Sequence, residues 1–229
     1  MKTQHSLTLI ATAIALSLPV ALAPHAQAAG IVRGSTATGP FTNIAGTSLA
    51  NVTNQSGLSA SYVSGTTDFD SYVATTTHNS IQASNSWLAS PTTGFVTFDL
   101  GASYTLDALA LWPLNPFSTL AIRGFTLYAD TDADPTNPGA SLGNFNAVNA
   151  SSAPVPAQVF NFTATTTRFI QLQITSNGGS ATGSGFGEVA FREVTATATT
   201  PEPSALVGLA AVVAFGAGLK RRHTQADKN

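Results

Sequence analysis

Residues 87–128 read WLASPTTGFVTFDLGASYTLDALALWPLNPFSTLAIRGFTLY and carry the strongest strand pattern in the chain. Apolar side chains alternate with other residues over 95–100, as they do on a strand that separates two environments. Gly101 interrupts the alternation, so we expect the strand to end there in a turn over residues 101–104. Phe98 falls on the inward face of this strand, and we expect its side chain to be buried.

A second strand is predicted over residues 106–112, where apolar side chains occupy much of both faces. A strand that is apolar on both faces is typical of the centre of a sheet. Pro113 and Pro116 end it, because proline has no N–H to donate to a neighbouring strand. A third strand follows over residues 122–128, and together the three predict a meander on which the rest of the chain packs.

Shorter apolar groups predict further strands on both sides of the meander. They lie at residues 41–44, 58–63, 72–74, 159–162, 168–175 and 188–194. No helical periodicity extends over ten residues between Gly30 and Val194. About eight short strands and no helix predict an all-β fold, an antiparallel β-sandwich of the jelly-roll type.

The composition excludes several classes of function. The chain has no cysteine, which excludes disulfides and thiolate chemistry. Between Gly30 and Pro203 there are four arginines, ten acidic residues and no lysine, so the net charge is four minus ten, or minus six. A protein that neutralises nucleic-acid phosphates needs a basic surface, and four scattered arginines do not supply one. We therefore expect no nucleic acid among the partners.

Residues 1–28 have the organisation of a secretory signal peptide. Lys2 supplies the positive start, residues 7–22 are apolar, and an Ala-Gln-Ala sequence supplies the cleavage site. An uncleaved membrane anchor is the alternative, but the apolar run is short and contains Pro19. The sequence predicts that the mature protein is exported.

Five short motifs occur in order along the chain. They are Trp87, Phe98-Asp99-Leu100-Gly101, Arg123 with Tyr128, Arg168-Phe169-Ile170-Gln171-Leu172 and Gly187-Glu188-Val189. Their order and approximate spacing resemble the discoidin or coagulation-factor type C family over about residues 62–194, although the family's cysteine pair is absent. The resemblance implies a galactose-binding-like jelly roll over residues 30–194, with Trp87 buried and carbohydrate as the ligand class.

The same resemblance implies that ligand-binding loops lie at one end of the sandwich. Aromatic faces and amide groups, which a sugar requires, occur in two of these loops. The candidate ligand-binding residues are Trp112, Asn115, Phe117 and Asn177. Trp112 is equally well placed to be a core residue, and Asn177 precedes a glycine, as in many turns.

Asp68, Asp70 and Glu188 form a candidate calcium site. In sugar-binding relatives of the discoidin fold, an early loop and the glutamate of the last strand hold a structural calcium, a cation that prefers oxygen ligands. Three carboxylates with no lysine nearby also repel one another unless a cation or protons compensate. The alternative is that Glu188 pairs with an arginine.

The C-terminal region combines a linker at residues 195–203, an apolar run within the tail at residues 204–229, and a basic cluster. The linker ends in Pro201, Glu202 and Pro203, and the basic cluster is Lys220, Arg221 and Arg222. The apolar run covers residues 205–219. At about 1.5 Å per residue it spans roughly 22 Å, short of a membrane core of about 30 Å.

This combination resembles the PEP-CTERM sorting signal of Gram-negative bacteria. The resemblance implies that the tail inserts transiently into the inner membrane, is recognised by an exosortase and is removed. It also implies a link to exopolysaccharide or biofilm, and a final location in the cell envelope, on the outer surface or in the extracellular matrix. A permanent membrane anchor is the alternative.

Catalytic motifs are few. His78 is the only histidine outside the signal peptide and the tail, and its threonine-rich surroundings predict a solvated side chain. Asp99 and Asp107 offer a carboxylate pair for glycoside hydrolysis, but we expect them to shape the predicted turn.

The sequence therefore predicts an exported, exosortase-sorted protein that binds carbohydrate or exopolysaccharide matrix without catalysis. A purely structural surface or biofilm-matrix protein is the first alternative. A glycoside hydrolase is the second.

Overall fold

The computed structural model describes residues 29–194 except 135 and 151. The predicted signal peptide, the Pro-Glu-Pro linker and the basic tail lie outside the described residues. Among the helices that are described, none has the length and apolarity needed to cross a membrane.

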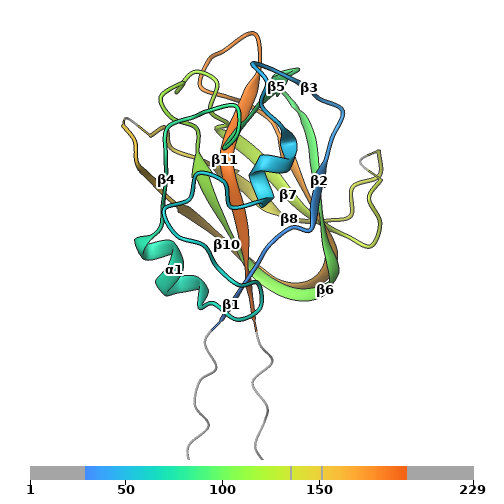
Figure 1. The fold of residues 1–229 in the computed structure, drawn as a ribbon. Helices are drawn as coiled ribbons and strands as arrows, with labels where there is room; N and C mark the ends of the chain where they lie inside the picture. The colour runs from blue at the N-terminus through green and yellow to red at the C-terminus, as the bar shows by residue number, and fades with distance from the viewer. Residues whose placement is uncertain (1–28, 135, 151, 195–229) are drawn as a thin grey trace, which may run out of the picture. The chain divides into compact units, whose positions relative to one another are not determined.

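The described part of the chain is built mostly of antiparallel strands, with two short helices (Figure 1). In order, the elements are β1 (Gly30–Val32), β2 (Thr36–Thr38), β3 (Thr42–Asn43), the 3-10 helix η1 (Leu49–Thr53), α1 (Phe69–Thr75), β4 (Thr77–His78), β5 (Trp87–Ser90), β6 (Gly94–Pro113), β7 (Gly124–Asp130), β8 (Ala140–Asn146), β9 (Val155–Pro156), β10 (Gln158–Ile174) and β11 (Ser184–Glu193).

Two long strands, β6 and β10, run through both layers of the sandwich. The first half of β6 pairs with β2 on one side and with the second half of β10 on the other. This half of β10 also pairs with β7, and β7 pairs with β8. The second half of β6 lies between β11 and the first half of β10, and β11 also pairs with β1 and β5. All these pairs are antiparallel, so the predicted all-β jelly-roll sandwich is confirmed.

The predicted turn at residues 101–104 is wrong, because β6 continues through it as one strand. Gly101 has φ of +82°, a conformation that favours glycine, and its N–H donates to Asp99 Oδ1 at 2.8 Å. The pairing with β10 skips residues 100–103 and resumes at Tyr104 in a shifted register. The glycine therefore bends the strand instead of ending it, as Figure 1 shows for β6.

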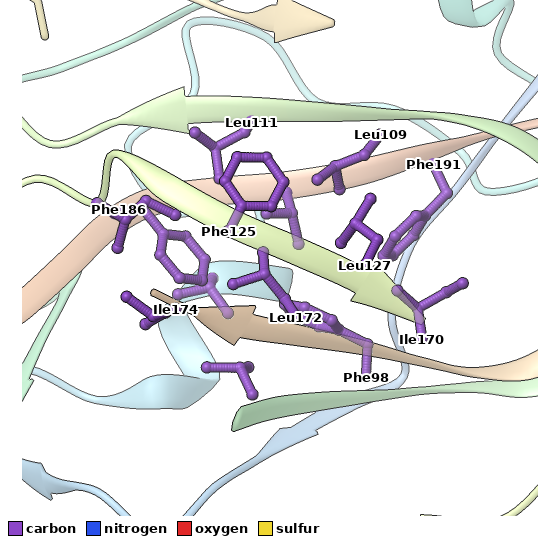
Figure 2. Close-up of a cluster of buried hydrophobic side chains, with 14 of the residues drawn as sticks. Phe98, Leu109, Leu111, Phe125, Leu127, Ile170, Leu172, Ile174, Phe186 and Phe191 are labelled. Atoms are coloured by element: carbon purple, nitrogen blue, oxygen red, sulfur yellow. The ribbon is translucent and has the colours of Figure 1, made fainter. Parts of the chain in front are cut away.

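The main core lies between the two layers. Figure 2 shows side chains from β6, β7, β10 and β11 pointing toward one another, among them Phe98, Phe125 and Phe191. Phe98 and Trp87 are both fully buried, as predicted. The rings of Phe98 and Phe191 pack edge to face, with centroids 5.7 Å apart.

The second half of β6 is buried on both faces, which confirms its predicted central position. Leu109 and Leu111 belong to the main core, whereas Ala108, Ala110 and Trp112 belong to a second cluster. Phe69 and Tyr72 of α1 are part of this second cluster.

The helix α1 was not predicted, and the strand expected at residues 72–74 lies within it. Asp68 caps its N-terminus by accepting the N–H of Ser71 at 2.9 Å. The strand expected at residues 58–63 is also wrong, because this segment is a loop with one isolated bridge from Leu58 to His78.

Candidate functional site

Of the four residues predicted to bind ligand, only Phe117 presents a large surface, with 50% of it exposed. Trp112 is a core residue: it is fully buried, and its Nε1–H donates to the carbonyl oxygen of Thr76 at 3.1 Å. It cannot meet a ligand at the surface, because its indole fills the second cluster described above. The alternative that it belongs to the core is the correct one.

Asn115 is buried, and Asn177 holds its own loop together. The carbonyl oxygen of Asn115 accepts the N–H of Ile81 at 2.7 Å, and its side chain is 3% exposed with Nδ2 unpartnered. The side-chain Nδ2 of Asn177 donates to the carbonyl oxygens of Ser180 and Gly183 at 2.9 and 2.8 Å. These bonds fold the loop before β11. The loops of Phe117 and Asn177 lie side by side, since the N–H of Ser180 donates to the carbonyl oxygen of Thr119 at 3.1 Å. The four residues do not form one surface, because Trp112 and Asn115 are buried.

A different set of residues lines a groove of about 650 Å³. They are Ser56, Gly57, Asn79, Ser80, Gln82, Ser84, Asn85, Ala153 and Pro154. Three segments distant in sequence meet here because β4 pairs with β9, which brings the loop after β4 beside the residues before β9. No charged and no aromatic side chain is part of this lining.

Asn85 holds the loop that forms one wall of the groove. Its Oδ1 accepts the N–H of Gln82 at 2.7 Å, and its Nδ2 donates to the carbonyl oxygen of Ser80 at 3.1 Å. The side chains of Asn79, Gln82 and Ser84 are exposed and make no hydrogen bond within the described part of the chain. Their amide and hydroxyl groups are therefore free to bind a ligand.

His78 lies beneath this groove and is 1% exposed, so the predicted solvated side chain is wrong. Its Nδ1 lies 2.8 Å from the carbonyl oxygen of Asn79, and its Nε2 lies 2.9 and 3.1 Å from those of Asn85 and Ser56. Gly57 permits this packing, because a Cβ there would lie 2.7 Å from His78 Nε2 and its φ is +84°. The imidazole thus links two of the three segments that line the groove, residues 56–57 and 79–85.

A second cavity of about 280 Å³ adjoins the groove, and Pro154 lines both. Its other lining residues are Pro113, Asn149, Ala150, Ser152, Val155, Pro156 and Gln158. Asn149 Oδ1 is buried without a hydrogen-bond partner.

The three carboxylates of the predicted calcium site are not gathered into one site. Asp68 caps α1, and Asp70 accepts a hydrogen bond from Arg192 Nη1 at 3.1 Å. Within residues 29–134, 136–150 and 152–194, no group of three acidic or histidine side chains is placed to hold a metal ion. Of the three carboxylates, only Asp70 pairs with an arginine in this part of the chain, and only Glu188 is fully buried.

Glu188 is fully buried on β11. Its Oε2 accepts the N–H of Gln55 at 2.9 Å, whereas its Oε1 has no partner. Burial raises the pKa of Glu188 well above its ordinary value, against the opposing effects of the Gln55 N–H and the positive charge of Arg33. Burial and the charge of Glu188 also raise the pKa of Tyr62, whose hydroxyl is buried and unpartnered as well.

The carboxylates offered for glycoside hydrolysis each bind an arginine. The turn that they were expected to shape is absent, but Asp99 also accepts the N–H of Gly101 at the bend of β6. Asp99 accepts hydrogen bonds from Nε and Nη2 of Arg168, both at 2.9 Å. Asp107 accepts from Nε of Arg192 at 2.7 Å, and Arg192 also lies over the ring of Phe69. These contacts link β6 to β10 and β11 and stabilise the sandwich.

No family model matches this sequence, and no curated protein matches it. Similar solved structures include the family 32 carbohydrate-binding module of Clostridium perfringens NanJ in complex with galactose, at 10% identity and a TM-score of 0.48, covering 72% of this chain and 99% of that module. The CBM32-5 module of CpGH89 from Clostridium perfringens, in complex with GalNAc-beta-1,3-galactose, has 14% identity and a TM-score of 0.47. The match covers 68% of this chain and 93% of that module. The CBM32 of AlyQ, in complex with 4,5-unsaturated mannuronic acid, has 20% identity, a TM-score of 0.43 and coverages of 70% and 96%. At these identities and TM-scores, the sugars belong to those proteins and do not identify a ligand for this chain.

Proposed function

We propose that this chain is an exported, non-catalytic protein whose β-sandwich binds carbohydrate in the groove beside His78. The observation that carries the proposal is the lining of the groove. Asn79, Gln82 and Ser84 present free amide and hydroxyl groups, which can both donate to and accept from sugar hydroxyls. The groove volume also lies within the range of about 300–1,000 Å³ that is usual for small-ligand sites.

The distribution of charged residues favours an uncharged ligand. Residues 29–194 contain four arginines and nine acidic residues, so the net charge of this part is four minus nine, or minus five. All three ion pairs between described residues use arginines outside the groove lining. An anionic ligand would lose hydration in the groove without gaining a cationic partner.

A glycan array probed with the exported protein tests this function. We expect binding to one or a few glycans and a clear loss of signal in the double variant Asn79→Ala/Gln82→Ala. Asn137→Ala is the matched control, because Asn137 is exposed and lines neither cavity. Absence of binding on the array favours the purely structural alternative, and release of reducing sugar from purified exopolysaccharide favours the hydrolase.

The sorting proposal rests on the two ends of the sequence. The signal peptide supports export through the inner membrane, and the Pro-Glu-Pro motif with the basic cluster supports recognition by an exosortase. We expect the mature protein in the envelope or matrix to lack residues 205–229. Mass spectrometry of that fraction tests this, and an intact tail on most molecules contradicts it.

A further inference from the structure

The groove and the second cavity lie side by side, because Pro154 forms part of the wall of each. Pro154 directly precedes Val155 and Pro156, the two residues of β9 that pair with β4. Val155 and Pro156 also line the second cavity. A ligand that fills the groove is therefore next to an opening of about 280 Å³.

The second cavity has the same chemical character as the groove. Asn149, Ser152 and Gln158 contribute amide and hydroxyl groups, and the remaining lining is proline, alanine and valine. Neither cavity has a charged residue in its lining. The two together thus offer amide and hydroxyl groups beside small apolar side chains.

Asn149 supplies an acceptor that no described residue satisfies, since its Oδ1 is buried and unpartnered. A buried polar atom without a partner is unfavourable by about 1–3 kcal/mol, so a group that donates to it there gains correspondingly. Gln158, in contrast, is occupied: its Oε1 accepts the N–H of Val148 and its Nε2 donates to the Val148 carbonyl oxygen, at 2.7 and 2.6 Å. Asn149 Oδ1 is therefore the unsatisfied acceptor of this lining. It has no surface open to solvent, so a ligand reaches it when the amide rotates toward the cavity, beside the exposed hydroxyl of Ser152.

We infer that the two cavities form one extended site for a linear, uncharged polysaccharide. One sugar residue binds Asn79, Gln82 and Ser84 in the groove, and the next crosses Pro154 and donates a hydroxyl to Asn149 Oδ1. This inference rests on the proposed function, and it adds the ligand class and its minimum length of two sugar residues. Polyuronates are excluded from the class, because both linings lack the arginine or lysine that a carboxylate requires.

The test uses the exported protein and polysaccharides of known charge. Affinity electrophoresis in dextran, galactan and laminarin, all uncharged, is compared with affinity electrophoresis in alginate. Oligosaccharides of one to six residues from the polysaccharide that binds best are then titrated by calorimetry. We expect retardation by at least one uncharged polymer but not by alginate, and an affinity that rises about tenfold from mono- to disaccharide.

Asn149→Ala separates the second cavity from the groove. We expect this variant to bind the monosaccharide as the wild type does and to lose the gain in affinity with length. Its melting temperature should not fall, because Oδ1 has no partner to lose. Asn79→Ala should weaken the binding of every oligosaccharide, and Asn137→Ala none.

The outcomes distinguish the inference from the proposed function. If no polysaccharide and no oligosaccharide binds, both fail. If the monosaccharide binds as tightly as the longer chains, if Asn149→Ala keeps the gain with length, or if alginate binds best, carbohydrate binding stands and the extended uncharged site is wrong.

Discussion

The imidazole Nε2 of His78 lies 2.9 Å from the carbonyl oxygen of Asn85, although the sequence around His78 predicts a solvated side chain. The same ring contacts the carbonyl oxygens of Ser56 and Asn79, so its three hydrogen-bonding contacts are all with the backbone of groove-lining residues. The geometry of the groove thus depends on a side chain that a bound ligand need not touch.

Replacing His78 by alanine should destabilise the domain and abolish glycan binding. Each buried carbonyl left without a partner is unfavourable by about 1–3 kcal/mol, so the melting temperature should fall by several degrees. Thermal unfolding followed by circular dichroism measures the first effect, and affinity electrophoresis the second. Gln82→Ala is the matched control: it should weaken binding at an unchanged melting temperature. A His78→Ala protein with wild-type melting and binding would show that the ring does not shape the groove.

Two phenylalanines should respond very differently to truncation. Phe98 is fully buried between the layers, and Phe98→Ala should lower the free energy of unfolding by about 3–5 kcal/mol. Phe117 is half exposed in the loop after β6, and Phe117→Ala should change the free energy of unfolding by no more than about 0.5 kcal/mol. Urea unfolding of both variants makes the comparison, and similar midpoints would contradict the assignment of Phe98 to the core.

The strand pattern of residues 95–112 was predictable, because alternation and apolarity on both faces report how a strand is buried. Its continuity was not, since a glycine can end a strand or bend it. The choice is made by β10, which pairs with β6 on both sides of Gly101 and lies far away in sequence. The helix α1 escaped prediction for a related reason, because seven residues are too few to show a helical period.

The site was less predictable than the fold. The groove depends on the β4–β9 pairing, which involves only two residues of each strand. Such a short pairing leaves no pattern in the sequence. The aromatic and amide residues that the sequence offered instead, such as Trp112 and Asn177, are used inside the domain, and nothing local to either residue distinguishes this use from ligand binding.

Asp99 should make stability depend on pH in the acid range. The hydrogen bonds from Arg168, and secondarily the N–H of Gly101 and the arginine charge, lower the pKa of Asp99 in the folded protein. The folded state therefore holds the charged carboxylate more strongly than the unfolded state does. This contribution is present above the unfolded-state pKa and is lost as the pH falls through the folded-state pKa.

Asp99→Asn removes that contribution, so its unfolding curve should differ from wild type at neutral pH and converge with it in acid. The effect should be small, because Asp99 and Arg168 are both partly exposed to solvent. Urea midpoints measured from neutral pH down to about pH 2 provide the test. A difference that stays constant over this range would show that the pair contributes nothing through charge.

Glu188 should make the stability of the domain depend on calcium. Its carboxylate is buried with Oε1 unpartnered, and it faces Tyr62, whose hydroxyl is also unpartnered. A proton or a cation must compensate this charge, and calcium prefers oxygen ligands of this kind. When a chelator removes calcium, the raised pKa of Glu188 makes the stability of the domain depend on pH. The contribution of Glu188 to stability is fully present below its unfolded-state pKa and is lost as the pH rises through its folded-state pKa.

We expect millimolar calcium to restore that loss and to raise the melting temperature of the wild type above neutral pH by binding the folded state. Glu188→Gln should not respond to calcium, and in chelator it should be more stable than the wild type at high pH. Asp70→Asn should respond as the wild type does, because Asp70 binds Arg192 and not Glu188. Calorimetry with and without calcium measures the shift in melting temperature. No shift in the wild type means that a proton neutralises Glu188. Loss of the shift in Asp70→Asn would restore the three-carboxylate site that the sequence predicts.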